Sequence, residues 1–472
     1  MKKFTKILLI GCLLVMVSCN NWLDVDPKSQ VKDKDLFASE MGFKEALSGV
    51  YSLMTKEGLY GKELTFGWLG VLGQEWTSVP YNYEDDQKYD FENAASEVRI
   101  DSVWTGLYNA IANANKLLKE LEGKENLFSG DNYSIIKGEV LALRAYLHFD
   151  LLRIFGASCA VGMERIAIPY VTEYAPTIFP QEKVGDFVGK VLKDLQDAAK
   201  CLENDPILTG RTVSEIDDNG YLMNRQVHLN YYAVKGLMAR VYLYKGDYAN
   251  AEVCAKEVIG SGCFEVKQEN LTNESVADLT FSTEHLFALN IVTLGNIVDK
   301  YLDGGNNSFA LEESRLSEYY GSSYDYRYLY LFKTGVGMSN TLRYLKKYDQ
   351  LESVSWAQSY RNKLPLICLP EMYYILAECR YHSSGDVLEP LNEVCRHRGV
   401  ADLSEADLSA FETLLLAEYR KEVIGGGQLF FQYKRLNRSV VPGTDVDLAG
   451  EGRYVIPMPK EELENPGWVS NQ

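Results

Sequence analysis

The sequence predicts a mostly α-helical chain that is built on irregular helix pairs and carries one loop-rich insertion. Three observations lead to this prediction. Long stretches place apolar residues at helical spacing, and several of them come in pairs joined by a short turn that contains Gly and Asp. Residues from about 264 to 350 lack this periodicity and contain short β-leaning runs instead. With 472 residues, 46% of them hydrophobic, the chain can bury a large core.

The clearest helix pair runs from Tyr231 to Ile259 and turns at Lys245-Gly246-Asp247. Ala239 and Tyr242 fit the small and aromatic positions at which the first helix of a tetratricopeptide pair meets its partner. One such pair cannot bury its apolar face alone, so it predicts neighbours stacked against it. An ordinary helical hairpin is the alternative, because the consensus positions require only small and aromatic residues, which occur in many helices.

Other helix pairs are expected before and after this one, within a single domain that spans residues 19–472. The segment 135–155 is apolar on most sides and is therefore expected to be a buried helix. His148 lies within it and is interpreted as a core residue with satisfied nitrogen atoms rather than as a catalytic group. The predicted pairs cover about 43–121, 135–203, 229–260 and 369–398.

The first 18 residues are predicted to be a lipoprotein signal peptide. Three lysines precede an apolar run, residues 7–17, that is too short to span a membrane. Val17-Ser18-Cys19 resembles a bacterial lipobox, in which Cys19 is acylated and becomes the new N-terminus. A signal peptide that is cleaved at another position is the alternative. The polar, Pro-broken residues 20–33 are interpreted as a tether.

Composition and motifs argue against several classes of function. A net charge of −18 disfavours nucleic acid, whose phosphates need basic surfaces. The nine cysteines include no C-x-x-C, so neither a disulfide framework nor a zinc site is expected, and a Cys254–Cys263 bridge is left open. The sequence contains no G-x-S-x-G, H-E-x-x-H, P-loop or EF-hand pattern. We therefore expect no catalytic residue, no cofactor and no metal site, and we leave open whether so acidic a protein binds calcium.

An aromatic stretch from Trp76 to Asp86 is the candidate ligand site. Gly and Pro interrupt the surrounding sequence, so this stretch is expected to be a loop. Aromatic rings can stack on pyranose faces while amides and carboxylates bind hydroxyl groups, and the polar turn in the insertion would contribute further contacts. Alternatively, the rings anchor a long loop to the core. The candidate residues are Trp76, Tyr81, Asn82, Tyr83, Asp85, Tyr301, Asn306, Asn307 and Phe309.

Several longer motifs occur in a fixed order along the chain and point to a known family. They are CNNWLDVDP at 19–27, WTGLYNAIANANKLL at 104–118, GEVLALRAYLHFDLLRIFG at 138–156, LPEMYYILAE at 369–378 and NPGWVSNQ at 465–472. Each motif alone is moderately specific, but the ordered set spans the chain from Cys19 to its end. On these residues the chain resembles the SusD/RagB-like outer-membrane lipoproteins.

The resemblance implies a SusD-like α-helical fold and a function without catalysis. Members of this family are nutrient-binding proteins that are anchored to the outer membrane by lipid and exposed at the cell surface. They pair with a SusC-like TonB-dependent outer-membrane transporter and act as a lid that delivers an oligosaccharide. The same architecture could instead bind peptides, and a surface glycosidase is a third possibility. No ligand residue can be transferred by motif, because the ligand loops differ across the family.

Overall fold

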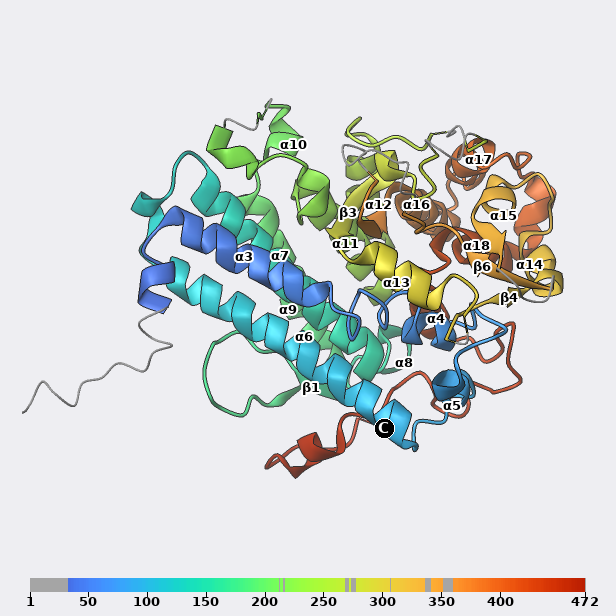
Figure 1. Ribbon diagram of the computed structural model, residues 1–472, viewed down its shortest axis with the longest axis horizontal. Helices are drawn as coiled ribbons and strands as arrows, with labels where there is room; N and C mark the ends of the chain where they lie inside the picture. Colours follow the sequence, from blue (N-terminus) through green and yellow to red (C-terminus); the bar gives the residue numbers. More distant parts are fainter. Residues whose placement is uncertain are drawn as a thin grey trace, which may run out of the picture.

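The computed structural model describes residues 33–211, 213–214, 217–267, 271–272, 277–305, 307–335, 341–350 and 360–471. The predicted signal peptide, Cys19 and nearly all of the tether lie outside the described residues. The chain is mostly α-helical, as the sequence predicts (Figure 1). None of the helices in the described ranges combines the length and the apolar character that a membrane crossing requires.

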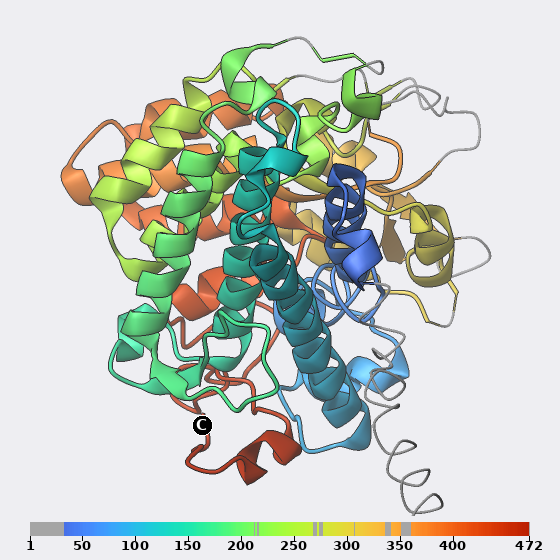
Figure 2. The same ribbon diagram turned by 90° about the vertical axis from the view of Figure 1, so that its left-hand side faces the viewer.

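Eight helices form a continuous stack in which each one packs against the next. The stack begins on the left of Figure 1, where α3 and α6 run side by side, and Figure 2 shows the same helices from that side. Continuous stacking buries the apolar faces that one helix pair would leave open. The helices are α3 (Glu40–Met54), α6 (Ala94–Leu121), α7 (Asn132–Phe155), α9 (Val184–Cys201), α11 (Tyr231–Lys245), α12 (Tyr248–Ile259), α16 (Leu369–Ser383) and α17 (Leu388–His397).

The turn between α11 and α12 has the predicted chemistry. Gly246 has a φ of +80°, which glycine adopts without steric penalty, and its N–H donates to the carbonyls of Tyr242 and Leu243. The Asp247 side chain then caps α12 by accepting from the Asn250 N–H at 3.2 Å. The helix pair at 231–259 therefore forms where the sequence placed it.

Shorter elements join the stack. After α17, a 3₁₀ segment η7 (Glu405–Ala410) is followed by α18 (Phe411–Val423). Ser404 starts η7 with a capping box, which explains the separate first turn. The remaining elements of the stack side are α4 (Trp68–Leu72), η2 (Tyr81–Tyr83), α5 (Glu84–Gln87), η3 (Glu125–Leu127), α8 (Cys159–Gly162), β1 (Ile166–Pro169), β2 (Gln181–Lys183), α10 (Pro206–Thr209), η4 (Asp217–Gly220), η5 (Arg225–Val227), α19 (Leu429–Arg435) and η8 (Lys460–Glu464).

The insertion, on the right of Figure 1, mixes short strands with short helices. Strand β3 (His285–Asn290) pairs antiparallel with β7 (Lys363–Cys368). A second sheet has the order β4 (Leu311–Glu312), β6 (Leu342–Leu345), β5 (Phe332–Thr334), and both pairs are antiparallel. The predicted β-leaning runs are present. They are accompanied by η6 (Ser282–Glu284) and three helices, α13 (Leu294–Tyr301), α14 (Glu313–Tyr320) and α15 (Tyr326–Tyr330).

The C-terminal part of the chain returns to the end of α7. The Lys434 Nζ of α19 donates to the carbonyls of Arg153 at 2.7 Å and Ile154 at 3.2 Å. The Asn471 amide donates to the Phe155 carbonyl at 2.6 Å. These donors satisfy carbonyls that a helix end leaves without partners, so the tail is fixed against the centre of the stack.

All seven cysteines in the described ranges are free thiols. Cys254 and Cys263 are therefore not bridged, which settles the one pairing that the sequence left open. Within the same ranges, no group of three or more His, Cys, Asp or Glu side chains is arranged to hold a metal ion.

Candidate functional site

The predicted ligand loop and the insertion meet through backbone hydrogen bonds. Ser78 and Ala310 form an antiparallel bridge in which each N–H donates to the other's carbonyl at 3.0 Å. The Glu312 N–H donates to the Thr77 hydroxyl oxygen at 2.6 Å. Two segments that are more than 200 residues apart in the sequence are thereby joined, close to α4 and β4 in Figure 1.

An aromatic cluster lies beneath this junction, with Phe309 at its centre. The Phe309 ring is fully buried, and its centroid lies 5.1 Å from that of Tyr83 and 6.0 Å from that of Trp76. Phe66 and Tyr301 complete the cluster at 5.9 and 6.4 Å from Phe309. Trp76 and Tyr83 are each 2% exposed, and Tyr301 is 8% exposed.

The stacking role that the sequence suggested for Trp76 and Tyr83 is therefore corrected. The Trp76 Nε1–H donates to the Phe66 carbonyl at 2.7 Å, and the Tyr83 hydroxyl donates to Glu63 Oε1 at 2.7 Å. Both polar tips are satisfied inside the protein and both rings are covered, so neither offers a free face to a sugar. These rings anchor the segment to the core, which is the alternative that the sequence left open. Phe309 and Tyr301 belong to the same cluster and are also buried, so their rings are not free to stack on a sugar either.

Helix α6 holds the segment from the other side through Asp86 and Arg99. Asp86 is buried, pairs with the Arg99 guanidinium and accepts from Trp68 Nε1 at 3.0 Å. Arg99 Nη2 also donates to the Asn82 carbonyl at 3.2 Å. Burial raises the pKa of Asp86 to about 6, against the opposing effect of Arg99, so the carboxylate stays ionised at neutral pH. This contact could not be predicted from the sequence, because Arg99 belongs to no motif.

Four predicted ligand residues remain at the surface, and we call them the rim. Tyr81 is 85% exposed. Asn82, Asp85 and Asn307 are also exposed, whereas Asn306 lies outside the described residues. The rim residues are Tyr81, Asn82, Asp85 and Asn307.

The rim does not lie on an irregular loop throughout. Tyr81 and Asn82 belong to η2 and Asp85 to α5, so the expectation of a loop holds only for residues 76–80. Pro80 precedes η2, and the first turn of α5 carries Glu84, Asp85 and Asp86, which the positive end of a helix favours.

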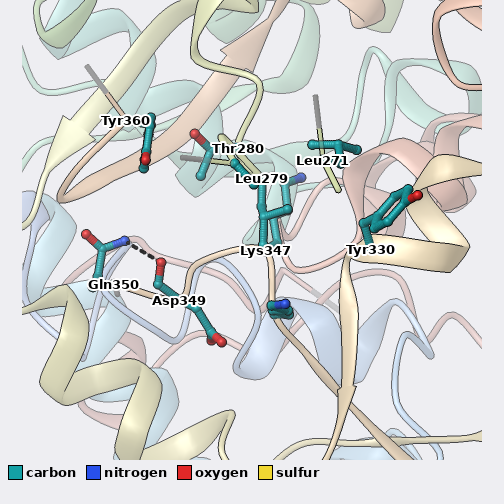
Figure 3. Close-up of a pocket in the computed structure, with 10 residues that line it drawn as sticks. Leu271, Leu279, Thr280, Tyr330, Lys347, Asp349, Gln350 and Tyr360 are labelled. Atoms are coloured by element: carbon teal, nitrogen blue, oxygen red, sulfur yellow. Dashed lines mark hydrogen bonds between the residues drawn. The ribbon is translucent and has the colours of Figure 1, made fainter. Parts of the chain in front are cut away.

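Figure 3 shows a pocket inside the insertion that is too small for a sugar. Its volume is about 20 Å³, enough for about one water molecule. The amide of Gln350 donates to the Asp349 carbonyl at 3.3 Å within it, as Figure 3 shows. This pocket is therefore not a candidate site for a sugar ligand.

A larger, charged cleft of about 730 Å³ opens directly after α5, between residues 88–92, the first turns of α6 and the C-terminal tail. Its walls carry both signs of charge, and Arg453 closes it by donating to the Tyr89 carbonyl at 3.4 Å. The charged residues that line it are Lys88, Asp90, Glu92, Glu97, Asp101, Arg453, Lys460 and Glu461.

Comparison with known proteins identifies relatives in sequence. A SusD-like family described as "Starch-binding associating with outer membrane" matches residues 21–243. SusD-like protein P38 of Formosa agariphila is 25% identical over 269 residues, which cover 56% of this chain and 47% of P38. The chain thus spans about half the length of P38 and of SusD-like protein P2 from the same organism.

Solved structures have the same fold at low sequence identity. A SusD superfamily protein from Bacteroides thetaiotaomicron superposes with a TM-score of 0.72 at 20% identity, covering 92% of this chain and all of the other. A laminarin-binding SusD-like protein superposes with a TM-score of 0.66 at 19% identity, covering 91% of this chain and all of that one. The family match over residues 21–243, the curated relatives and the ordered motifs together support the SusD/RagB-like family for this chain, and the solved structures have its fold.

Proposed function

We propose that this protein is a non-catalytic lipoprotein of the cell surface that captures oligosaccharides. The observation that carries the proposal is the rim, because it combines a free tyrosine ring with amide and carboxylate groups on a firmly anchored base. The description of the family as starch-binding and the laminarin-binding relative in structure support carbohydrate as the ligand class.

The rim has the chemistry that a sugar requires. The exposed Tyr81 ring can stack on the apolar face of a pyranose. Asn82, Asp85 and Asn307 can exchange hydrogen bonds with the hydroxyl groups at its edge. Because the aromatic cluster and Arg99 already fix the backbone beneath them, little conformational entropy is lost when the ligand binds.

Delivery and anchoring complete the proposal. The predicted signal peptide over residues 1–18 directs export, and the lipid on Cys19 holds the protein at the outer membrane. The captured oligosaccharide is then passed to a SusC-like TonB-dependent transporter, over which this protein closes as a lid. The family description, which includes association with the outer membrane, supports this location.

The test is a calorimetric binding screen of the soluble form that starts at Asn20, using neutral oligosaccharides prepared from starch and laminarin. Tyr81→Ala is expected to weaken binding about tenfold, the equivalent of one lost stacking contact of about 1.4 kcal/mol. Tyr324→Ala is the matched control, because Tyr324 is 76% exposed but lies beside the end of α17. Equal affinities for the two variants would overturn the placement of the site at the rim.

The same samples test for catalysis. Bound oligosaccharide should be recovered intact after long incubation, and shortened products on chromatography would identify the protein as a glycosidase instead.

A peptide ligand is the second candidate, and the charged cleft beside α6 is the observation that favours it. Walls of both charge signs suit a chain that carries amines and carboxylates. A peptide panel in the same screen decides between the two. Binding of peptides alone, weakened by Arg453→Ala and unchanged by Tyr81→Ala, would replace the oligosaccharide proposal.

A further inference from the structure

We propose that a second glycan-binding cleft lies between α6, the segment that joins β1 to β2, and the C-terminal tail. It has a volume of about 400 Å³ and lies where α6 approaches the tail, near the C-terminus marked in Figure 1. The inference shares the ligand class of the proposed function but uses none of the rim residues. We call this the tail cleft. Its central residues are Trp104, Tyr108, Asn109, Glu462, Asn465 and Trp468.

Three aromatic rings shape the tail cleft. Trp104 is 3% exposed and forms its floor, while Tyr108 and Trp468 are half-buried beside it. The Trp104 ring centroid lies 4.9 Å from that of Tyr108 and 6.5 Å from that of Trp468. The interplanar angles are 57° and 67°, so the rings form a concave corner rather than a flat patch.

Hydrogen bonds hold each ring in place through its polar tip. Trp104 Nε1 donates to Glu462 Oε1 at 2.9 Å. Trp468 Nε1 donates to the Phe179 carbonyl at 3.1 Å, and the Tyr108 hydroxyl donates to the Pro169 carbonyl at 2.9 Å. Since every polar tip is used within the protein, the corner is preorganised. Trp104 is covered, so the apolar surface open to a ligand comes from the half-buried rings of Tyr108 and Trp468.

The polar groups around the rings are neutral or already paired. Glu462 accepts from Trp104 through one oxygen and from the Asn465 amide at 2.8 Å through the other. Asn109 is exposed at the edge of the cleft. No lysine or arginine is among the described residues that line it, so the cleft lacks the cation that an anionic ligand needs. A neutral ligand with one apolar face and several hydroxyl groups, such as a pyranose, fits this chemistry.

The wall backbone is poorly suited to a peptide. A peptide that binds as an added strand needs free N–H and carbonyl groups along an edge. Here the carbonyls of Pro169 and Phe179 accept from Tyr108 and Trp468, and the Val171 carbonyl accepts from the Asn115 amide at 2.9 Å. With these acceptors occupied, contacts to a ligand must come from rings and side chains, as in glycan binding.

The tail cleft and the rim are separate sites that share one helix. Arg99, which holds the rim segment, and Trp104, which floors the cleft, are five residues apart on α6. Five residues correspond to about 7.5 Å along a helix and a rotation of about 140°. The two sites therefore face different sides of α6 and can be disabled independently.

The experiment is a calorimetric titration of the Asn20–Gln472 chain and its variants with neutral oligosaccharides prepared from starch and laminarin. We expect two sites per molecule, of which Tyr81→Ala weakens one, and Trp468→Ala and Asn109→Ala each weaken the other about tenfold. Trp468→Phe keeps most of the ring surface and should retain more affinity than Trp468→Ala. Thermal unfolding of each variant verifies that it is folded. If Trp468→Ala does not fold, Asn109→Ala tests the cleft instead, because Asn109 is exposed.

Each outcome separates the two proposals. One site that is lost in Tyr81→Ala and unchanged in Trp468→Ala and Asn109→Ala overturns the tail cleft and leaves the rim. One site with the opposite response supports the tail cleft and overturns the rim. Absence of binding to either oligosaccharide, or binding that ignores all of these substitutions, overturns both. If Trp468→Ala weakens the binding of an apolar peptide but not the binding of any oligosaccharide, the glycan assignment of the cleft is overturned.

Discussion

His148 shows how one residue within the core can govern the pH dependence of stability. Its Nδ1–H donates to the Arg144 carbonyl and its Nε2 accepts from the Val171 N–H, both at 2.9 Å, and its ring stacks on Tyr170. This confirms the prediction of a satisfied core histidine. Burial lowers its pKa to about 3, so the folded protein keeps it neutral.

We predict that this histidine lowers stability in mild acid. Between pH 6.5 and 3, His148 is protonated in the unfolded chain but not in the folded protein. The free energy of unfolding therefore falls as the pH falls, by about 2 kcal/mol at pH 5. Urea unfolding at pH 7 and pH 5 measures this difference. His148→Gln can keep both hydrogen bonds without titrating, so its loss between the two pH values should be about 2 kcal/mol smaller than that of the wild type. Equal losses would contradict the assignment.

Which aromatic residues of the candidate site are exposed could not be predicted from the sequence. Trp76 and Tyr81 occur in the same Gly- and Pro-broken stretch, and composition cannot tell which of the two rings is covered. The answer depends on Phe309, which lies more than 200 residues away in the sequence. Helix pairs, by contrast, were predictable because the apolar periodicity that buries a helix lies within the helix itself.

At the scale of elements, the junction of the ligand segment with the insertion determines whether the rim is ordered. Phe309 contacts rings from both sides of this junction and is fully buried. We predict that Phe309→Ala destabilises the protein by about 3–5 kcal/mol and speeds amide hydrogen exchange at residues 74–92. Oligosaccharide affinity should fall as well, because the rim would then have to be ordered on binding.

Phe187→Ala is the matched control for this junction. Phe187 is equally buried but packs in α9 against His148 and Tyr170. A comparable loss of stability is expected, without a selective increase of exchange at residues 74–92. If both variants exchange alike in that segment, Phe309 does not hold the rim.

At the scale of the whole molecule, a buried ionic cluster ties the insertion to the C-terminal helices. Arg398 pairs with Glu284 before β3 and with Glu422 on α18, each at 2.7 Å. Arg327 on α15 also contacts Glu422, at 2.9 Å. Although burial disfavours the charged form, Arg398 and Arg327 lower the pKa of Glu422 to about 2, whereas burial raises that of Glu284 to about 7. The sequence could not reveal this cluster, because its members come from four separate elements.

We predict that Arg398→Met costs about 3–5 kcal/mol at pH 7, because it leaves two buried carboxylates with too few cations. Without Arg398 their folded pKa values rise above the unfolded values, so the folded state gains protons and recovers stability as the pH is lowered. Denaturant unfolding at pH 7.5 and pH 5.5 should therefore show a smaller loss at the lower pH. Arg396→Met removes a half-exposed arginine from the last turn of α17, two residues before Arg398, and should change stability by about 0.5 kcal/mol or less. A similar loss for both variants would argue against the cluster.

Attachment of the whole molecule to the membrane is predicted to depend on one residue. In a host with an outer membrane, full-length Cys19→Ala should lose a fatty-acid label and move from the membrane fraction to the soluble fraction, because the acyl chains supply about 0.8 kcal/mol of membrane affinity per buried CH₂ group. Cys12→Ala is the control, since Cys12 lies in the apolar run of the signal peptide and should leave both unchanged. If Cys19→Ala retained the label, the lipid would be attached to another residue.

Because the rim and the tail cleft lie within residues 33–471, Cys19→Ala should keep the affinity of the wild type for oligosaccharides, and cells that carry it should lose uptake without loss of binding.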